Sequence, residues 1–311
     1  MDIVLTFDDN YSCHACATIA SVCKNNKGKH VFHVLSDGIG DKNKKRITEF
    51  VTSQNSEVFY YLLDKSRFEN FPIGKGTANT YVSLATYYRL FIPELLPVDV
   101  KKVLYLDCDV IVNGCLEDLW NLSFDKTNEC IYAVEEFRNL AMDGSRRLNY
   151  PSSYSYFNAG VLLINLKELR KLYSVDKAIA FIRTHEIKFH DQDVLNGLLY
   201  KYKCFLPLKY NLLDSFLIKN ATFPQRYKDQ YDDIKHPVII HYSGPIKPWN
   251  KECNNPYKDI YWVYADATPW KGIELREKYQ RFSDKMFFHM KNLVKQTLEV
   301  LHLKYFSYVN I

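Results

Sequence analysis

Over the first third of the chain, short apolar runs alternate with segments of helical character. Residues 3–7, 30–35 and 58–63 consist mainly of Val, Ile, Leu, Phe and Tyr and have the length of strands. A polar segment, residues 41–51, lies between the second and third of these runs and is predicted to be a helix. Because strands that alternate with helices form parallel sheets covered by helices, this order predicts an α/β fold.

The next apolar run, residues 102–110, ends with two carboxylates, Asp107 and Asp109, on either side of Cys108. Its content of Val, Leu and Tyr predicts a buried strand. Where the backbone turns at the end of a strand, two such acids can converge on one divalent cation. The alternative is that one acid caps a turn while the other is solvated. The residues that accompany the pair favour the metal site.

A third acid follows the first predicted strand. Asp8 comes directly after residues 3–7, and the sequence from Asp8 to Asn10 is suited to capping a helix that begins near Tyr11. Ligands of parallel α/β sheets bind at the carboxyl ends of the strands. We therefore expect Asp8 and Asp107 to lie close together in space.

A second long apolar run, residues 156–166, is interrupted by Asn158, Ala159 and Gly160. Small residues inside a strand are typical of places where a ligand or another backbone comes close. The triplet therefore belongs among the candidate site residues.

Helices are expected in three further places. Residues 82–91 are predicted to form one that Pro93 stops, and residues 166–185 another, opened by the capping pair Asn165 and Glu168. A third helix begins at His190, where Asp191 is either a cap or a functional acid. The Tyr- and Ser-rich residues between 138 and 154 are expected to be a loop.

The last predicted strand, residues 238–242, contains His241 and leads into a loop with two prolines. Gly244 and Lys247 in that loop offer backbone amides and a cation to an anion, as phosphate-binding loops do. Two carboxylates and an imidazole suit Mn²⁺ better than Ca²⁺. Together these groups predict metal-assisted departure of a phosphate group, with a nucleotide sugar as the natural substrate.

The charge of the chain argues against nucleic acid as a partner. Forty-one basic and 36 acidic residues leave a formal charge of +5, which is weak for 311 residues. The N-terminus has no signal region, and no apolar stretch has the length of a membrane span, so we expect a cytoplasmic protein.

The C-terminal residues 257–311 differ in character from residues 1–256, which we expect to form the catalytic domain. They are rich in aromatic and basic residues, and the end of the chain has the pattern of an amphipathic helix. Such a helix can rest on an anionic membrane surface, here the inner face of the cell membrane. The alternative is a helix that packs on the domain.

Six motifs, taken in order, closely resemble family 8 retaining glycosyltransferases, in particular bacterial lipopolysaccharide and lipooligosaccharide galactosyl- and glucosyltransferases. The resemblance runs from Asp2 to about Asn250 and implies a GT-A fold, a Rossmann-like mixed sheet flanked by helices, followed by a helical tail. The motifs are residues 8–11, 86–90, 103–109, 157–166, 191–196 and 241–249.

The resemblance implies a role for each matching residue. Asp107, Asp109 and His241 would hold Mn²⁺, or alternatively Mg²⁺, on the diphosphate of a UDP-hexose, and Gly244 and Lys247 would contact the phosphates. Groups expected at the nucleoside are Asp8 and Asn10 on uridine, Tyr11 stacked on uracil, and the backbone of Cys108. Residues expected around the donor sugar are Arg89, Asn158, Ala159, Asp191 and Gln192.

The resemblance also implies transfer of a hexose with retention of configuration. The neutral amide of Gln192 is a poor nucleophile, so we favour front-face attack, in which the departing phosphate takes the acceptor's proton. Gln192 and Asp191 would stabilise the positive charge on the sugar, and Asp191 is the less favoured covalent candidate. Glu135 and Glu136 lie where an acid that contacts a saccharide or glycolipid acceptor is expected. Galactose is favoured slightly over glucose.

Two other functions remain open from the residues. A haloacid-dehalogenase-like phosphatase also places Asp-x-Asp after an apolar strand, although its motif normally lies near the N-terminus. A non-catalytic nucleotide-sugar-binding protein could keep the metal site without turnover, but the full set of matched donor residues argues against it.

Overall fold

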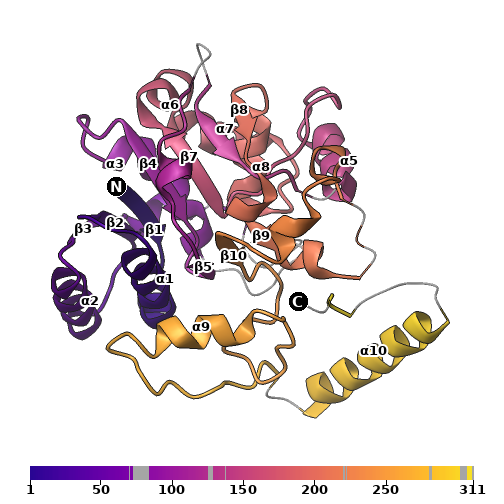
Figure 1. Ribbon diagram of the computed structural model, residues 1–311. Coiled ribbons are helices and arrows are strands. Elements are labelled where there is room, and N and C mark those ends of the chain that lie inside the picture. Colours follow the sequence, from indigo (N-terminus) through magenta and orange to yellow (C-terminus); the bar gives the residue numbers. More distant parts are fainter. Residues whose placement is uncertain are drawn as a thin grey trace.

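The computed structural model describes residues 1–69, 71–72, 84–124, 129–136, 138–219, 221, 223–279, 282–301 and 307–309. Within these residues the chain forms a seven-stranded sheet and a separate three-stranded sheet, with helices on both faces of the larger one (Figure 1). The expected α/β fold with a mixed sheet is confirmed.

The large sheet has the strand order β3-β2-β1-β4-β7-β6-β8. The first four strands are parallel, β7 is antiparallel to β4 and to β6, and β8 is parallel to β6. Its strands are β1 (Asp2–Thr6), β2 (Val31–Ser36), β3 (Glu57–Leu62), β4 (Lys102–Leu106), β6 (Ile131–Ala133), β7 (Val161–Asn165) and β8 (Lys203–Phe205).

The small sheet begins immediately beyond the end of β4. Its central strand is β10 (Ile239–His241), which pairs antiparallel with β5 (Val110–Val112) and parallel with β9 (Leu212–Leu213). Because β5 follows β4 after three residues, the segment Asp107 to Asp109 joins the two sheets.

Side chains of the central strands alternate between two apolar cores. One core contains residues of α1, α2, α9 and the small sheet, and the other contains residues of α3, α6, α7 and α8. The helices are α1 (Ser12–Asn25), α2 (Asp41–Ser53), α3 (Ile92–Leu95), α4 (Glu117–Trp120), α5 (Arg138–Arg147), α6 (Leu166–Leu172), α7 (Val175–Thr184), α8 (His190–Leu199), α9 (Lys258–Ala265) and α10 (Phe282–Val300).

Two helix predictions were wrong in detail. Leu84–Phe91 is a 3₁₀ helix, and residues 82–83 lie outside the described residues. Pro93 does not stop it but occupies the first turn of α3. The N–H groups of a first turn make no hydrogen bond within the helix, so proline, which lacks this group, fits there. The predicted helix 166–185 is two helices, because Ser174 caps α7 by accepting from the amide of Lys177.

The expected loop between residues 138 and 154 contains a helix, α5. A buried ion pair holds its C-terminal end, because Arg147 donates to Asp193 of α8 at 2.7 Å. The partner lies 46 residues away in the sequence, so a local pattern did not reveal it.

The C-terminal segment contacts the rest of the chain at several points. α9 packs against α1 through the buried Tyr261 and Tyr264. After α10, which lies at the lower right of Figure 1, the amide of Val309 donates to Leu217 O at 2.7 Å. The division at residue 256 stays a prediction. No helix in the described part of the chain is long and apolar enough to cross a membrane.

Candidate metal and nucleotide-sugar site

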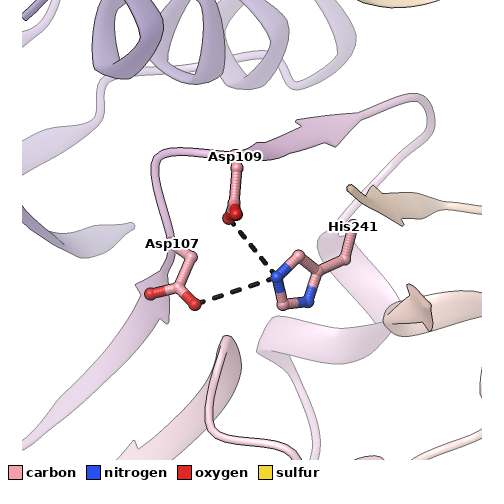
Figure 2. Close-up of side chains that lie close together, drawn as sticks. All are labelled: Asp107, Asp109 and His241. Atoms are coloured by element: carbon pink, nitrogen blue, oxygen red, sulfur yellow. Dashed lines mark ion pairs between the residues drawn. The ribbon is translucent and has the colours of Figure 1, made fainter. Parts of the chain in front are cut away.

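Three side chains converge where the two sheets meet (Figure 2). Asp107 follows β4, Asp109 precedes β5, and His241 is the last residue of β10. The pairing of His241 with Val110 and the bond from the Tyr242 amide to Asp109 O (3.0 Å) fix β10 beside the two acids. Strand pairing therefore brings together residues more than 130 positions apart.

The geometry of this group fits a divalent cation. Ligand atoms of Asp107, Asp109 and His241 all lie within 4.8 Å of one another. His241 Nε2 is 3.3 Å from Asp109 Oδ1 and 3.8 Å from Asp107 Oδ2. Asp109 Oδ1 is buried and has no hydrogen-bond partner, which is costly unless a cation or another donor satisfies it. Two carboxylates and one imidazole form a mixed oxygen and nitrogen donor set for a divalent metal ion.

Asp107 is oriented by two neighbours. Its Oδ1 accepts from Arg89 Nη2 and from the Tyr105 hydroxyl, each at 2.6 Å. The other oxygen, Oδ2, is therefore the one that faces His241. Arg89 also forms an ion pair with Asp191 at 2.8 Å, so a single guanidinium links the metal group to α8.

Lys247 supplies a second positive charge at the site. Its Nζ donates to Asp109 Oδ2 and to Tyr242 O, each at 2.6 Å. Burial alone would raise the pKa of the Asp109 carboxyl, but Lys247 and His241 outweigh burial and hold that pKa below its usual range. The Asp109 side chain is thus a carboxylate at neutral pH, the form that binds a metal.

A buried chain of hydrogen bonds lies behind His241. His241 Nδ1 is 2.9 Å from Asn211 Oδ1, and Asn211 Nδ2 donates to Asn158 Oδ1 at 2.9 Å. Asn158 Nδ2 donates in turn to Glu136 at 2.9 Å. The side chain of Asn158, expected near the donor sugar, is engaged by these partners and by the Gly160 amide.

Gly160 approaches the metal group more closely than any side-chain-bearing residue could. A Cβ atom at this position would lie 2.2 Å from His241 Cε1 and 2.8 Å from Asp107 Oδ2. Its carbonyl accepts from the Asp107 amide at 2.8 Å. At the triplet predicted to mark the close approach of a ligand or a backbone, the structure places the side chains of His241 and Asp107 against Gly160.

Aromatic rings line the side of the site nearest α1. Tyr11 lies edge-on to Trp249, and Trp249 stacks on His14 with ring centres 3.6 Å apart. Burial raises the pKa of Tyr11 to about 12 and lowers the pKa of His14 to about 3, so both rings are neutral at pH 7. Asp8 caps the turn before α1 by accepting from the Tyr11 amide.

The N-terminal turn of α8 places two polar side chains in the same cavity as the metal group. Gln192 Oε1 accepts from the Ala159 amide at 3.0 Å. Asp191 accepts from the Thr86 hydroxyl as well as pairing with Arg89. Burial raises the pKa of Asp191 to about 6, while Arg89 acts in the opposite direction.

The loop after β10 is held by an acid that the sequence did not single out. Asp214 accepts from the Gly244 amide at 2.9 Å and from Asn255 Nδ2 at 2.6 Å. A Cβ atom on Gly244 would lie 2.3 Å from Asp214 Oδ2, so this position requires glycine. The Gly244 amide, expected at the phosphates, thus has a carboxylate partner in the chain itself.

Most of the expected site residues line one cavity of about 1070 Å³. Asn10, which is exposed, and Glu135, which pairs with Arg226, are not among its lining residues. The expected residues that line it are Asp8, Tyr11, Arg89, Asp107, Cys108, Asp109, Glu136, Asn158, Ala159, Asp191, Gln192, His241, Gly244 and Lys247.

Asn211 and Asp214 are two polar residues beside the metal group and the Gly244 loop that the sequence did not indicate. They flank β9, a strand of only two residues, so the sequence offers one apolar pair between two polar side chains. That signal is too short to indicate a strand. Their importance depends on the pairing of β9 with β10, which puts them beside His241 and Gly244.

Comparison with known proteins gives a consistent result. The profile of the family described as Glycosyl transferase family 8 matches residues 2–253. General stress protein A of Bacillus subtilis is 30% identical over 283 residues, which cover 88% of this chain and 96% of the relative. A lipopolysaccharide 1,2-glucosyltransferase of Escherichia coli is 28% identical, over 89% of this chain and 81% of its own length.

A solved structure shares the fold. The galactosyltransferase LgtC, in complex with donor and acceptor sugar analogs, aligns with a TM-score of 0.77 and 27% identity. The alignment covers 86% of this chain and 96% of that protein.

Proposed function

Since this chain belongs to glycosyl transferase family 8 and is a retaining hexosyltransferase, we propose that it transfers galactose or glucose from a UDP-sugar to a saccharide acceptor with Mn²⁺ as the metal. Its mixed sheet flanked by helices is the GT-A fold that the resemblance implied. The relatives named above include both a glucosyltransferase and a galactosyltransferase, and we favour galactose slightly. The proposed acceptor is a surface glycan or lipopolysaccharide.

The observation that carries the proposal is the convergence of Asp107, Asp109 and His241 in one cavity with Lys247 and the first turn of α8. The three ligands would hold the cation, which would neutralise the diphosphate as its bond to the sugar breaks. Lys247, already at the metal group, would donate to the same phosphates.

The surroundings of α8 support front-face transfer. The carboxylate of Asp191 is engaged by Arg89 and Thr86, which favours charge stabilisation over nucleophilic attack. Gln192 lies beside it with its carbonyl oxygen bound to the Ala159 amide. In the proposed mechanism both residues stabilise the positive charge on the sugar, and the departing phosphate accepts the proton of the acceptor hydroxyl.

Activity should depend on the ionisation of Asp191. Burial raises the pKa of Asp191 to about 6, and only the carboxylate stabilises positive charge. We therefore expect kcat at saturating Mn²⁺ and donor to fall about tenfold per pH unit below pH about 6. The Asp191→Asn variant should lose this acidic limb. A kcat of the wild-type enzyme that stays constant down to pH about 4.5 would contradict this role.

The donor is identified by nucleotide release without acceptor. The protein would be incubated with Mn²⁺ and a panel of UDP-, GDP- and CMP-sugars, and we expect slow release of UDP from one UDP-hexose. Rapid release of phosphate from small phosphoesters instead would support the phosphatase alternative. Metal-dependent UDP binding without release or transfer would support the non-catalytic one.

Glu136 is the better placed of the two acids proposed for the acceptor. It is buried, lines the cavity and accepts from Asn158, whereas Glu135 lies outside the lining and pairs with Arg226. We therefore propose that the acceptor approaches the Glu136 side of the cavity.

We also propose that the protein is cytoplasmic and attaches peripherally to the anionic inner face of the cell membrane through α10. This helix has two faces. Phe288, Asn292 and Lys295 line the cavity, whereas apolar side chains elsewhere on the helix are 52–70% exposed. These exposed side chains are Met286, Phe287, Met290, Leu293 and Val294. An exposed apolar stripe accompanied by lysines is typical of helices that lie on membranes.

Two glutamates on this stripe should weaken membrane binding. Phe287→Glu with Leu293→Glu is expected to reduce sedimentation with phosphatidylglycerol vesicles at least about tenfold, because two apolar anchors are lost. Leu62→Glu, at a residue 76% exposed on β3, is the matched control and should bind like the wild type. Equal sedimentation of all three proteins would exclude α10 as the anchor.

A further inference from the structure

Two buried asparagines connect His241 to the backbone at Gly160. His241 Nδ1 lies 2.9 Å from Asn211 Oδ1, and Asn211 Nδ2 lies 2.9 Å from Asn158 Oδ1. Asn158 Oδ1 also accepts from the Gly160 amide at 2.9 Å. Asn211 is completely buried, and His241 and Asn158 are 4% and 6% exposed, so water does not compete for these groups.

The Gly160 amide sets the direction of every hydrogen bond in this series from His241 to Gly160. A backbone amide can only donate, so the Gly160 N–H requires the oxygen of Asn158 and not its nitrogen. That oxygen can only accept, so Asn211 presents its nitrogen to Asn158 and its oxygen to His241. Because an amide oxygen can only accept, the proton between Asn211 and His241 belongs to His241 Nδ1.

We propose that Asn211 is a positioning residue that keeps a proton on His241 Nδ1 and thereby leaves Nε2 as the atom open to a cation. Nε2 is the nitrogen that faces Asp109 and Asp107, at 3.3 and 3.8 Å. A histidine ligand normally donates its other N–H to a neighbouring acceptor, which fixes the tautomer and the orientation of the ring. This inference rests on the proposed metal role of His241.

If Asn211 only filled space, loss of its hydrogen bond to His241 would leave Mn²⁺ affinity unchanged. Two variants separate this packing role from the positioning role. Asn211→Leu keeps the branched shape and the number of heavy atoms of the side chain but removes the acceptor for His241 Nδ1. Asn211→Asp keeps an acceptor oxygen toward His241 Nδ1 and replaces the donor to Asn158 Oδ1 with a second oxygen, so it tests the acceptor separately from the bond to Asn158. Because partners of metal ligands typically contribute 10- to 100-fold to affinity, Asn211→Leu should weaken Mn²⁺ binding by about that factor. Asn211→Asp, which keeps the acceptor, should bind Mn²⁺ with an affinity within about threefold of the wild type.

The control is a buried asparagine away from the site. Asn26 donates to Val22 O and accepts from the Leu116 amide at 2.6 Å, and it is 7% exposed. Asn26→Leu should lower the melting temperature, as removal of a buried amide does, and leave Mn²⁺ affinity unchanged. Calorimetric titration of the full chain with Mn²⁺ measures all four proteins without any substrate.

The tautomer itself is read by nitrogen NMR of ¹⁵N-histidine-labelled protein without metal, at a pH high enough for the His241 ring to be neutral, because beside Asp109 and Asp107 the charged ring would carry a proton on both nitrogens. The His241 signals are assigned from a His241→Gln variant. We expect a proton on Nδ1 in the wild type and in Asn211→Asp, and loss of that preference in Asn211→Leu. Wild-type protein with Nδ1 unprotonated, or Asn211→Leu with wild-type Mn²⁺ affinity, would overturn the inference. If the wild type bound no Mn²⁺, the proposed metal role would fail, while the NMR signals would still test the tautomer.

Discussion

Replacement of Arg89 by methionine is expected to lower the free energy of unfolding by about 3–5 kcal/mol and to abolish activity. The guanidinium is 7% exposed and pairs with Asp107 and Asp191 at 2.6 and 2.8 Å. Burial alone would lower the pKa of Arg89, but the two acids outweigh burial and raise it above its usual range, so the charge is always present. Methionine would leave the buried Asp191 and the partly buried Asp107 without their cation.

Denaturant unfolding of Arg89→Met, Arg89→Lys and Arg67→Met measures this effect. Arg67 pairs with Glu94 at 2.5 Å, but both side chains are 33–46% exposed, so its loss should cost at most about 1 kcal/mol. Lysine should not rescue position 89, because a single ammonium cannot reproduce the fork of a guanidinium. Equal losses for Arg89→Met and Arg67→Met would show that the buried pairs contribute no more than a surface pair.

Gly160→Ala is expected to reduce Mn²⁺ affinity by about 100-fold or more, with a cost in stability of about 1–3 kcal/mol. The added methyl carbon would lie 2.2 Å from His241 Cε1 and 2.8 Å from Asp107 Oδ2, so one of the two ligands has to move. The same backbone carries the amide that donates to Asn158 and the carbonyl that accepts from Asp107. A shift of the Gly160 backbone would therefore also displace Asp107 and Asn158 through these two hydrogen bonds.

Gly114→Ala provides the comparison for this substitution. A Cβ atom at Gly114 would lie 3.5 Å from Val238 Cγ1, an ordinary van der Waals distance. Titration calorimetry with Mn²⁺ should find wild-type affinity for Gly114→Ala and a strong loss for Gly160→Ala. Wild-type affinity for both variants would mean that His241 and Asp107 can move to accommodate the methyl group without loss of Mn²⁺ binding.

Much of the fold and the metal group could be predicted because the signals were local. Alternating apolar runs and helical segments indicated the parallel strands, and acids at strand ends indicated where ligands gather. Asp107 and Asp109 are neighbours in the sequence, and His241 ends a recognisable apolar strand. The convergence of these three residues was therefore foreseeable from the residues together with the resemblance.

What the sequence did not reveal depends on long-range pairing. Asn211 becomes part of the site only because the two-residue strand β9 pairs with β10. Ser174 divides the predicted helix 166–185 because it caps α7. The spacing of apolar residues alone does not distinguish one long helix from two shorter ones. Arg89 and Asn158, both expected around the donor sugar, line the cavity and also bind protein groups that are distant in the sequence. Their role at the sugar stays a prediction.

The metal dependence of UDP-hexose turnover, measured in the wild type and in Asp109→Asn, tests most directly whether Asp107, Asp109 and His241 form the metal site of a transferase. Release of UDP should require Mn²⁺, stop with a chelator and resume when Mn²⁺ is restored. Asp109→Asn should lose at least about a thousandfold in kcat/KM, about 4 kcal/mol of transition-state stabilisation, because Asp109 would contribute directly to holding the cation. Asp176→Asn, at an exposed acid of α7, should behave like the wild type. Turnover that survives both the chelator and Asp109→Asn would contradict a metal-dependent transferase centred on Asp107, Asp109 and His241.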